Sequence, residues 1–350
     1  MINNLELLKQ VCKVPGAPGY EQKIRQFIID QVTPMVDEVR LDAMGNVIAI
    51  KKGVQDKKVM VAAHMDEIGF IVTHIDDNGF IRFHTLGGFD PKTLTAQRVI
   101  IHGKEDVIGV MGTKPVHVMT PEERSKAPKI TEYFIDTGLP ADKVRHLIEV
   151  GNPITREREL IVMGECVNSK SLDNRVSVFV LLEALSILKG QEVPYDVYGV
   201  FTVQEEVGLR GAVSSASGIN PDFGIAIDVT LAYDLPGAQG HEKVSCLGHG
   251  AAIKVLDGMT ICDYRMVDYM KSVAKKKAVK HQIEILPAGG TDTAGIQRHS
   301  NGGAIAGAIS IPTRYLHQVI EMAHMDDITA SIQLLVECLK GLDGHDWSFS

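Results

Sequence analysis

The stretch KVMVAAHMDEIGF, residues 58–70, decides how the rest of the sequence is interpreted. Its first part, KVMVAA, is a continuous apolar run, which predicts a strand buried on both faces as in parallel or mixed sheets. The run leads directly into His64 and Asp66, which are polar. Ligands gather beyond the carboxyl ends of strands in open α/β sheets, because the loops converge there. These two side chains therefore mark a candidate site.

Three further apolar runs are followed by residues suited to binding metal. VYGVFTVQ leads into Glu205 and Glu206, FGIAI into Asp228, and AISIPTRYL into His317. A fifth candidate, Asp173, sits where NSKSLDNR turns into a predicted helix. Two histidines with several carboxylates form a donor set that suits zinc, cobalt or manganese. The pattern predicts a metal site where the strands end.

Hydrolysis by a metal pair needs a carboxylate that bridges two ions about 3.5–4 Å apart, together with a base close to the attacking water. Glu205 and Glu206 could supply a ligand and a base. Adjacent side chains point to opposite faces of a regular strand, so both can serve one site only where the strand ends. Gly208 is close enough in sequence to help make that turn.

Each of these residues also has an ordinary structural interpretation. His64 alone fits a hydrogen-bonded core histidine, and two adjacent glutamates usually lie on a solvated surface. Asp173 and Asp228 could cap helices. Their joint placement after successive predicted strands indicates a site, because these separate explanations do not produce it.

The fold class indicated is α/β, with a mixed sheet interrupted by a β-rich insertion. We predict a catalytic domain of residues 1–66 plus 161–350, and an inserted β-barrel over residues 67–160, where the short runs FIVTHI, FIRFHTL, RVIIHG and VIGVMG are separated by Gly and Pro. Before it, VDEVRLDA and NVIAIKKG predict a hairpin. A final helix is predicted over 328–342, with Asp326 and Asp327 as caps.

Composition excludes several classes of function. The 350 residues carry a net charge of −8, which argues against nucleic acid as a partner because phosphate binding needs a basic face. No apolar stretch is long enough to span a bilayer, so we expect no membrane partner. The five cysteines are scattered without a CxxC pair, and the N-terminus has no signal-peptide pattern. We therefore expect a reduced, cytoplasmic protein.

Seven segments together resemble the tetrahedral (TET) aminopeptidases, a dinuclear-metal family that includes glutamyl, leucyl and deblocking aminopeptidases. In family order, they are AAHMDEIGF, LGGFDPKTLTAQRV, NSKSLDNR, FTVQEEVGLRGA, AIDV, GGTDTAG and RYLHQ. The resemblance covers nearly the whole chain. It implies an aminopeptidase that removes residues from the N-termini of peptides, with two divalent ions per subunit. Zinc is favoured, with cobalt or manganese as alternatives.

The resemblance also assigns roles. It implies one ion bound by His64, Asp173 and Asp228, and a second bound by Asp173, Glu206 and His317, with Asp173 as the bridge. Glu205 would be the general base, and Asp66 would support His64. The loop holding Thr291, Asp292 and Thr293 would lie near the specificity pocket, although a plain Gly-rich turn also explains it. Gln318 departs from the family pattern, since Ser is expected there in many relatives.

The same resemblance implies that the insertion is a PDZ-like domain that builds dimers, and that six dimers close into a hollow dodecamer. An N-acyl amino-acid deacylase or carboxypeptidase with the same di-metal site is the main alternative. Those enzymes insert their second domain between the last carboxylate ligand and the final histidine, whereas here the long insertion separates His64 from Asp173. A glycoside hydrolase is a further alternative, but aromatic residues, the usual sugar platforms, make up only 5% of the chain.

Overall fold

Strand β3, Gln55–His64, lies inside an 11-stranded mixed sheet in a computed structural model that describes residues 4–349. The main path of the sheet is β1–β2–β12–β3–β13–β16–β17–β11–β10, and β14 and β15 extend it beside β16. Its other strands are β1 Glu38–Leu41, β2 Val47–Lys51, β10 Ile161–Met163, β11 Cys166–Ser169, β12 Tyr195–Thr202, β13 Phe223–Leu231, β14 Ala251–Leu256, β15 His281–Ile285, β16 Ile305–Arg314 and β17 Glu321–His324.

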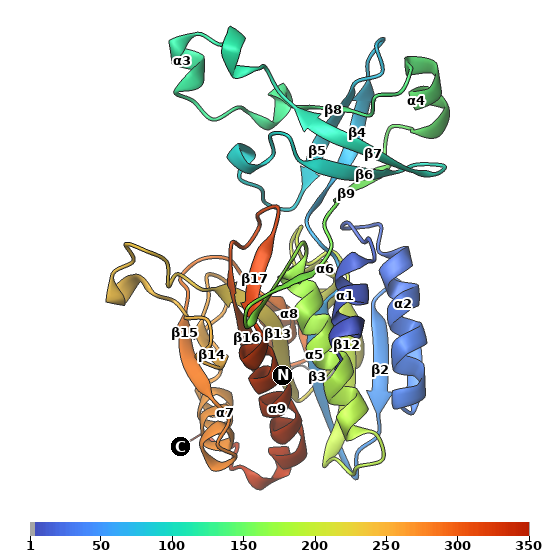
Figure 1. The fold of residues 1–350 in the computed structure, drawn as a ribbon. Coiled ribbons are helices and arrows are strands. Elements are labelled where there is room, and N and C mark those ends of the chain that lie inside the picture. Colours follow the sequence, from blue (N-terminus) through green and yellow to red (C-terminus); the bar gives the residue numbers. More distant parts are fainter. Residues whose placement is uncertain (1–3, 350) are drawn as a thin grey trace.

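Helices cover both faces of this sheet (Figure 1). Five of them pack with one set of strand residues, including Val59, Val61 and Ala63: α1 Leu5–Lys13, α2 Gln22–Val32, α5 Leu172–Leu188, α7 Tyr264–Lys276 and α9 Met325–Gly341. Two pack with the alternate residues, including Met60 and Ala62: α6 Arg210–Ile219 and α8 Asp292–His299. Successive strand side chains point to opposite faces, so the apolar run of β3 serves both cores.

The insertion forms a closed six-stranded barrel that stands above the carboxyl edge of the sheet (Figure 1). Its strands are β4 Gly69–Ile75, β5 Ile81–Leu86, β6 Arg98–His102, β7 Asp106–Gly112, β8 Phe134–Asp136 and β9 Pro153–Arg156, with helices α3 Pro121–Arg124 and α4 Ala141–Leu147 in its loops. The four runs expected to be strands are β4 to β7. The barrel has its own core, which includes Phe70, Ile101 and Ile135.

The predicted hairpin is confirmed, since β1 and β2 pair antiparallel around Gly45, which has a φ of +93°. The predicted caps of the final helix are wrong. His324 is the N-cap of α9, and its side chain accepts the Asp326 amide. Asp327 instead accepts the amides of Gly248 and Gly250, at 2.7 and 2.6 Å. Within residues 4–349, no helix combines the length and the apolar character needed to cross a membrane.

Candidate active site

Four adjacent strands deliver the candidate ligands to one edge of the sheet, except for Asp173, which lies in the first turn of α5. β12, β3, β13 and β16 are neighbours and pair in parallel, so their carboxyl ends meet. His64 is the last residue of β3, and His317 follows the end of β16 by three residues. Asp228 was expected to follow the end of its strand, but it lies within β13, which continues to Leu231. Its side chain still faces the site, since it lies 3.8 Å from His64.

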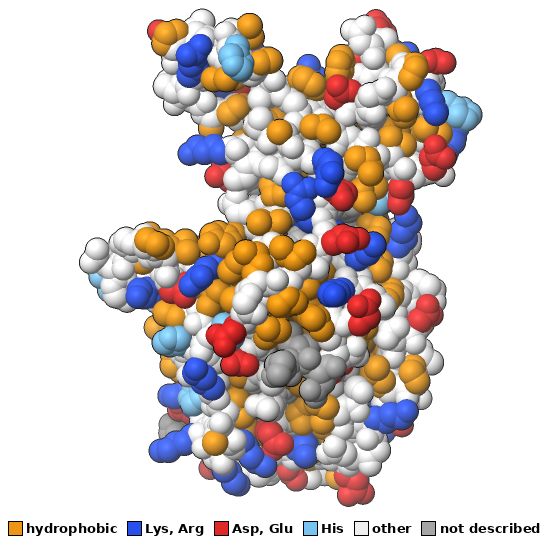
Figure 2. Space-filling view, viewed as in Figure 1, with side chains coloured by type: hydrophobic (Ala, Val, Ile, Leu, Met, Phe, Trp, Pro, Cys, Tyr) orange, Lys and Arg blue, Asp and Glu red, His pale blue; other side chains and the backbone are white. Residues whose placement is uncertain are grey.

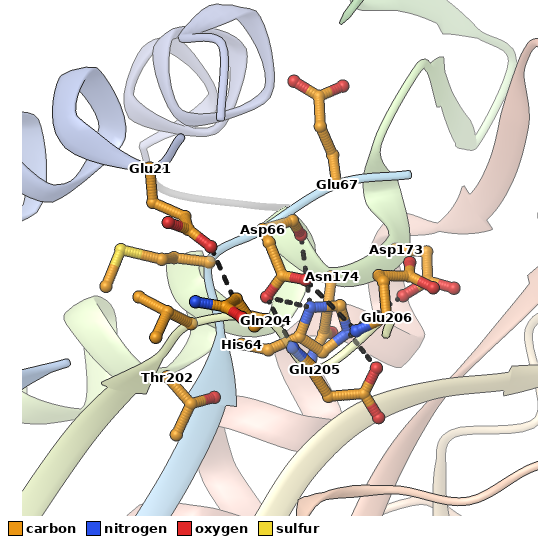
Figure 3. A network of polar contacts seen from close by, with 12 residues as sticks. Glu21, His64, Asp66, Glu67, Asp173, Asn174, Thr202, Gln204, Glu205 and Glu206 are labelled. Carbon is orange, nitrogen blue, oxygen red and sulfur yellow. Dashed lines mark hydrogen bonds and ion pairs between the residues drawn. The ribbon is translucent and has the colours of Figure 1, made fainter. Parts of the chain in front are cut away.

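A tight turn after β12 brings both glutamates to the site. The turn contains left-handed backbone at Gln204, Gly208 and Leu209, with φ of +54°, +122° and +56°. Asp66 fixes this turn, because its two carboxylate oxygens accept the amides of Glu205 and Glu206, each at 3.1 Å. Figure 3 shows Asp66 between these amides and the His64 ring, whose Nδ1 lies 3.5 Å from the carboxylate. Asp66 therefore orients the glutamates as well as facing the histidine.

The candidate ligands form two groups that share Asp173. In each group, the potential donor atoms lie within 4.8 Å of one another: His64, Asp173 and Asp228 in one, and Asp173, Glu206 and His317 in the other. Asp173 Oδ1 lies 3.2 Å from His64 Nε2, and its Oδ2 lies 3.3 Å from His317 Nε2. The carboxylate thus presents one oxygen to each group, as a bridging ligand requires.

The chemistry of this donor set fits two divalent cations. The side chains of Asp173, Glu206 and Asp228 are almost fully buried, and Glu206 Oε1 has no hydrogen-bond partner among the described residues. Burial, together with the negative charge of Asp173, raises the pKa of Glu206 and of Asp228 to about 8. Burial alone would lower the pKa of His317, but Asp173 and Glu206 outweigh it and raise that pKa to about 10. Several buried carboxylates therefore resist ionisation when no cation is near. Bound cations would stabilise their ionised forms.

Glu205 lies beside His64 without belonging to either group. Its Oε2 is 3.8 Å from His64 Nε2, and its side chain is 9% exposed. Burial raises the pKa of Glu205 well above the usual value. The charge of His64 lowers this pKa, whereas the negative charges of Asp228 and Glu206 raise it. Perturbed acids in clefts are candidates for proton transfer.

The site opens into a cavity of about 480 Å³. Beside the candidate ligands, its wall includes Lys254, Asp257, Met259 and Leu286. Lys254 Nζ lies 2.7 Å from the buried carboxylate of Glu284 and 3.5 Å from Asp257. The sequence interpretation missed this wall. A lysine within the apolar run AAIKVL was the available signal, because charged residues are rarely buried without a partner.

The loop expected near the specificity pocket contributes Thr291 to the cavity wall. Thr291 Oγ1 donates to Asp257 at 3.1 Å and also contacts Thr293 at 3.0 Å. Asp292 is buried and accepts a hydrogen bond from Thr202 at 2.5 Å, and neither Asp292 nor Thr293 is among the residues that line the cavity. A substrate contact therefore stays a prediction that the geometry favours for Thr291 alone.

The shifted pKa values predict how the metal-free protein responds to pH. Glu206 and Asp228 keep their protons in the fold up to about pH 8 but lose them near pH 4 when unfolded, so the stability of the fold falls as pH rises between these values. The raised pKa of His317 acts in the same direction between about pH 6.5 and pH 10. We expect the melting temperature in chelator to fall from about pH 5.5 to pH 8.5. Added zinc should raise it more at the higher pH.

Differential scanning fluorimetry across this range measures both effects. Glu206→Gln is the matched control, because it removes one of the titrating groups and should flatten the profile. A melting temperature that rises with pH in chelator would contradict the expectation.

An α/β sheet with an inserted barrel, and with two carboxylate–histidine groups sharing one aspartate, defines a hydrolase of the dinuclear-metal class. Comparison with known proteins identifies the family within this class. Residues 45–334 match the M42 glutamyl aminopeptidase family, and the chain belongs to that family. It is a metallo-aminopeptidase, a peptide hydrolase.

Individual relatives are similar in sequence to this chain over nearly its whole length. A lysyl aminopeptidase of Pyrococcus furiosus is 35% identical, over 97% of this chain and 98% of its own length. The solved structure of a TET aminopeptidase from the archaeon Thaumarchaeota archaeon SCGC AB-539-E09 is 34% identical, covering 97% of this chain and 96% of that one, with a TM-score of 0.93. The Pyrococcus horikoshii TET1 peptidase, described as able to assemble into a tetrahedron or a large octahedral shell, is 31% identical over 96% of this chain and 98% of that one, with a TM-score of 0.87.

Proposed function

We propose that this aminopeptidase releases single residues from the free N-termini of peptides, with Glu205 as the general base. One ion would be held by His64, Asp173 and Asp228, and the other by Asp173, Glu206 and His317. The observation that carries the proposal is that Asp173 offers one oxygen to each group, while Glu205 lies 3.8 Å from His64 and belongs to neither group.

Each side chain then has a separate task. Bound ions would supply Lewis-acid polarisation of the scissile carbonyl and activate the attacking water. Glu205 accepts the proton of that water at its carboxylate and passes it to the leaving amine. Asp66 holds the backbone of Glu205 and Glu206 through two hydrogen bonds, so that the base and the ligand keep their relative positions. Thr291, which lies in the cavity wall, would contact the substrate residue that is released.

We favour zinc for both positions, with cobalt or manganese as alternatives. Two histidines and several carboxylates suit all three ions, and selection among them depends on availability as well as on geometry. The five free cysteines support a reducing, cytoplasmic setting.

We also propose that residues 67–160 form a dimerisation domain attached to a catalytic domain of residues 1–66 plus 161–350, and that dimers build a dodecamer. The assembly described for the Pyrococcus horikoshii relative supports this. Exposed apolar side chains outside the insertion support association between copies of the chain, because Ile161, Val162 and Met163 of β10 and Ile320 beside β17 are 39–53% exposed. Figure 2 shows hydrophobic side chains gathered below the barrel in that part of the molecule. Large exposed apolar patches usually mark interfaces.

A panel of aminoacyl p-nitroanilides with free and N-acetylated amines tests the activity. We expect only the free-amine substrates to be cleaved, with activity lost on chelation and regained when zinc or cobalt is restored. Cleavage of the acetylated substrates instead would favour an N-acyl amino-acid deacylase. Absence of cleavage in protein that holds two ions would reject the proposal. The same panel measures which side chain the cavity prefers.

A further inference from the structure

His317 is held in place differently from the other histidine of the site. His64 is 2% exposed, and its Nδ1 is 3.2 Å from the carbonyl of Asp66 within the same α/β unit. The His317 side chain is 41% exposed and lies in a loop where Tyr315 and His317 both have positive φ, at +62° and +57°. Packing around His317 is therefore not enough to fix its ring, and its orientation depends on specific hydrogen bonds.

The first of these bonds comes from the barrel. His317 Nδ1 donates to the carbonyl of Gly88 at 3.0 Å, and Gly88 follows strand β5 by two residues. This bond leaves Nε2 facing Asp173 and Glu206, at 3.3 and 3.5 Å. Metal-binding histidines are commonly oriented by a hydrogen bond from the other ring nitrogen to a carbonyl or carboxylate. A residue of the insertion therefore faces the back of this candidate ligand.

The second contact also comes from the barrel. Arg156 is the last residue of β9 and is 3% exposed. Its Nη1 donates to the carbonyl of Gln318, the residue after His317, at 2.5 Å, and lies 3.8 Å from the carboxylate of Glu321. Glu321 in turn accepts the backbone amide of Asp173 at 2.9 Å. Arg156 thus joins the His317 loop to the residue that both donor groups share.

We propose that Gly88 and Arg156 are positioning residues, through which the barrel sets His317 for the second ion. The inference rests on the proposed two-ion site. It requires that weakening these contacts affects the group Asp173, Glu206 and His317, while the group His64, Asp173 and Asp228 keeps its ion. The barrel is then a part of the metal site as well as an attachment to the catalytic unit.

Two single substitutions disturb these contacts by different means. A methyl group at Gly88 would lie 3.2 Å from His317 Nδ1, so Gly88→Ala displaces the ring without changing any charge. Arg156→Gln weakens the bond to Gln318 and removes the charge beside Glu321. Arg158→Gln is the matched control, because Arg158 lies two residues further on and its guanidinium donates to Gln97 and Glu157. Gly218→Ala is the control for the added methyl, since that site faces open space.

The experiment titrates zinc into chelator-stripped, full-length protein by calorimetry, with circular dichroism to verify the fold. In Gly88→Ala, we expect the ion at His64, Asp173 and Asp228 to bind within about threefold of the native affinity, and the ion at Asp173, Glu206 and His317 to bind about 10- to 100-fold more weakly. In Arg156→Gln, the ion beside His317 should again be weakened more than the ion beside His64, although Glu321 also accepts the amide of the shared Asp173. Both controls should bind two ions as the native chain does. If Arg156→Gln does not fold, Gly88→Ala decides the question alone.

Two results would overturn the inference: native affinity for both ions in the variants, or equal weakening of both. The native titration separates this inference from the proposed function. A native chain that binds fewer than two ions rejects the two-ion site itself. Two ions bound equally well by native and variant chains overturn only the role of the barrel.

Discussion

Glu205→Gln is expected to lower kcat by about 10²- to 10⁴-fold, the usual contribution of a general base. The amide keeps the shape of the side chain but cannot accept the proton. KM should change little, because Glu205 belongs to neither donor group. Metal content should stay at two ions per chain. Steady-state kinetics on a free-amine aminoacyl p-nitroanilide, together with elemental analysis of the same sample, measures both quantities.

The neighbouring residue provides the control. Glu206→Gln is an identical chemical change one position along the turn, but Glu206 lies in the donor group of His317. It should therefore lose the second ion, and its activity should recover in part when zinc is added in excess. Excess zinc should not rescue Glu205→Gln. If Glu205→Gln kept kcat within about threefold of the native value, another group would have to take the proton.

The sequence predicted that the polar residues after the apolar runs lie close together, because that signal was local. Each apolar run that forms β3, β12 or β16 leads into a polar residue, and parallel pairing brings those ends to one edge. Asp228 shows the limit of this reasoning, since nothing in FGIAIDVTL shows that the strand continues to Leu231. The four predicted barrel strands were continuous β-type runs, whereas β8 and β9 are only three and four residues long and were missed.

The contacts that organise the site could not be predicted in this way. Glu321 reaches the amide of Asp173 across 148 positions, and Gly88 reaches His317 across 229. Such pairs carry no periodicity and no motif, because they arise only when segments far apart in the sequence pack together. The role of Asp66 on the amides of Glu205 and Glu206 is similar. Its HxD spacing suggested a partner for His64. Asp66 also holds the backbone of the turn after β12, which that spacing does not indicate.

Asp173→Asn is expected to remove both ions, because Asp173 is the only residue present in both donor groups of the described chain. An amide offers no second anionic oxygen, so it cannot bridge two cations as the carboxylate does. Lewis-acid stabilisation is worth several kcal/mol, and about 1.4 kcal/mol corresponds to a tenfold change in rate. We therefore expect kcat/KM to fall by about 10³-fold or more.

Ion content distinguishes a bridge from an ordinary ligand. Asp228→Asn should weaken only the ion beside His64, and His317→Ala only the ion beside Glu206, so each is expected to retain one ion. Asp173→Asn should retain neither at the zinc concentration that saturates the native chain, as measured by elemental analysis after gel filtration. If Asp173→Asn retained one ion, Asp173 would serve a single position, and the remaining groups would have to hold the other ion without it. In that case the separation of its two oxygens between His64 and His317 would reflect hydrogen bonding in the metal-free site, and the bridging role would be rejected.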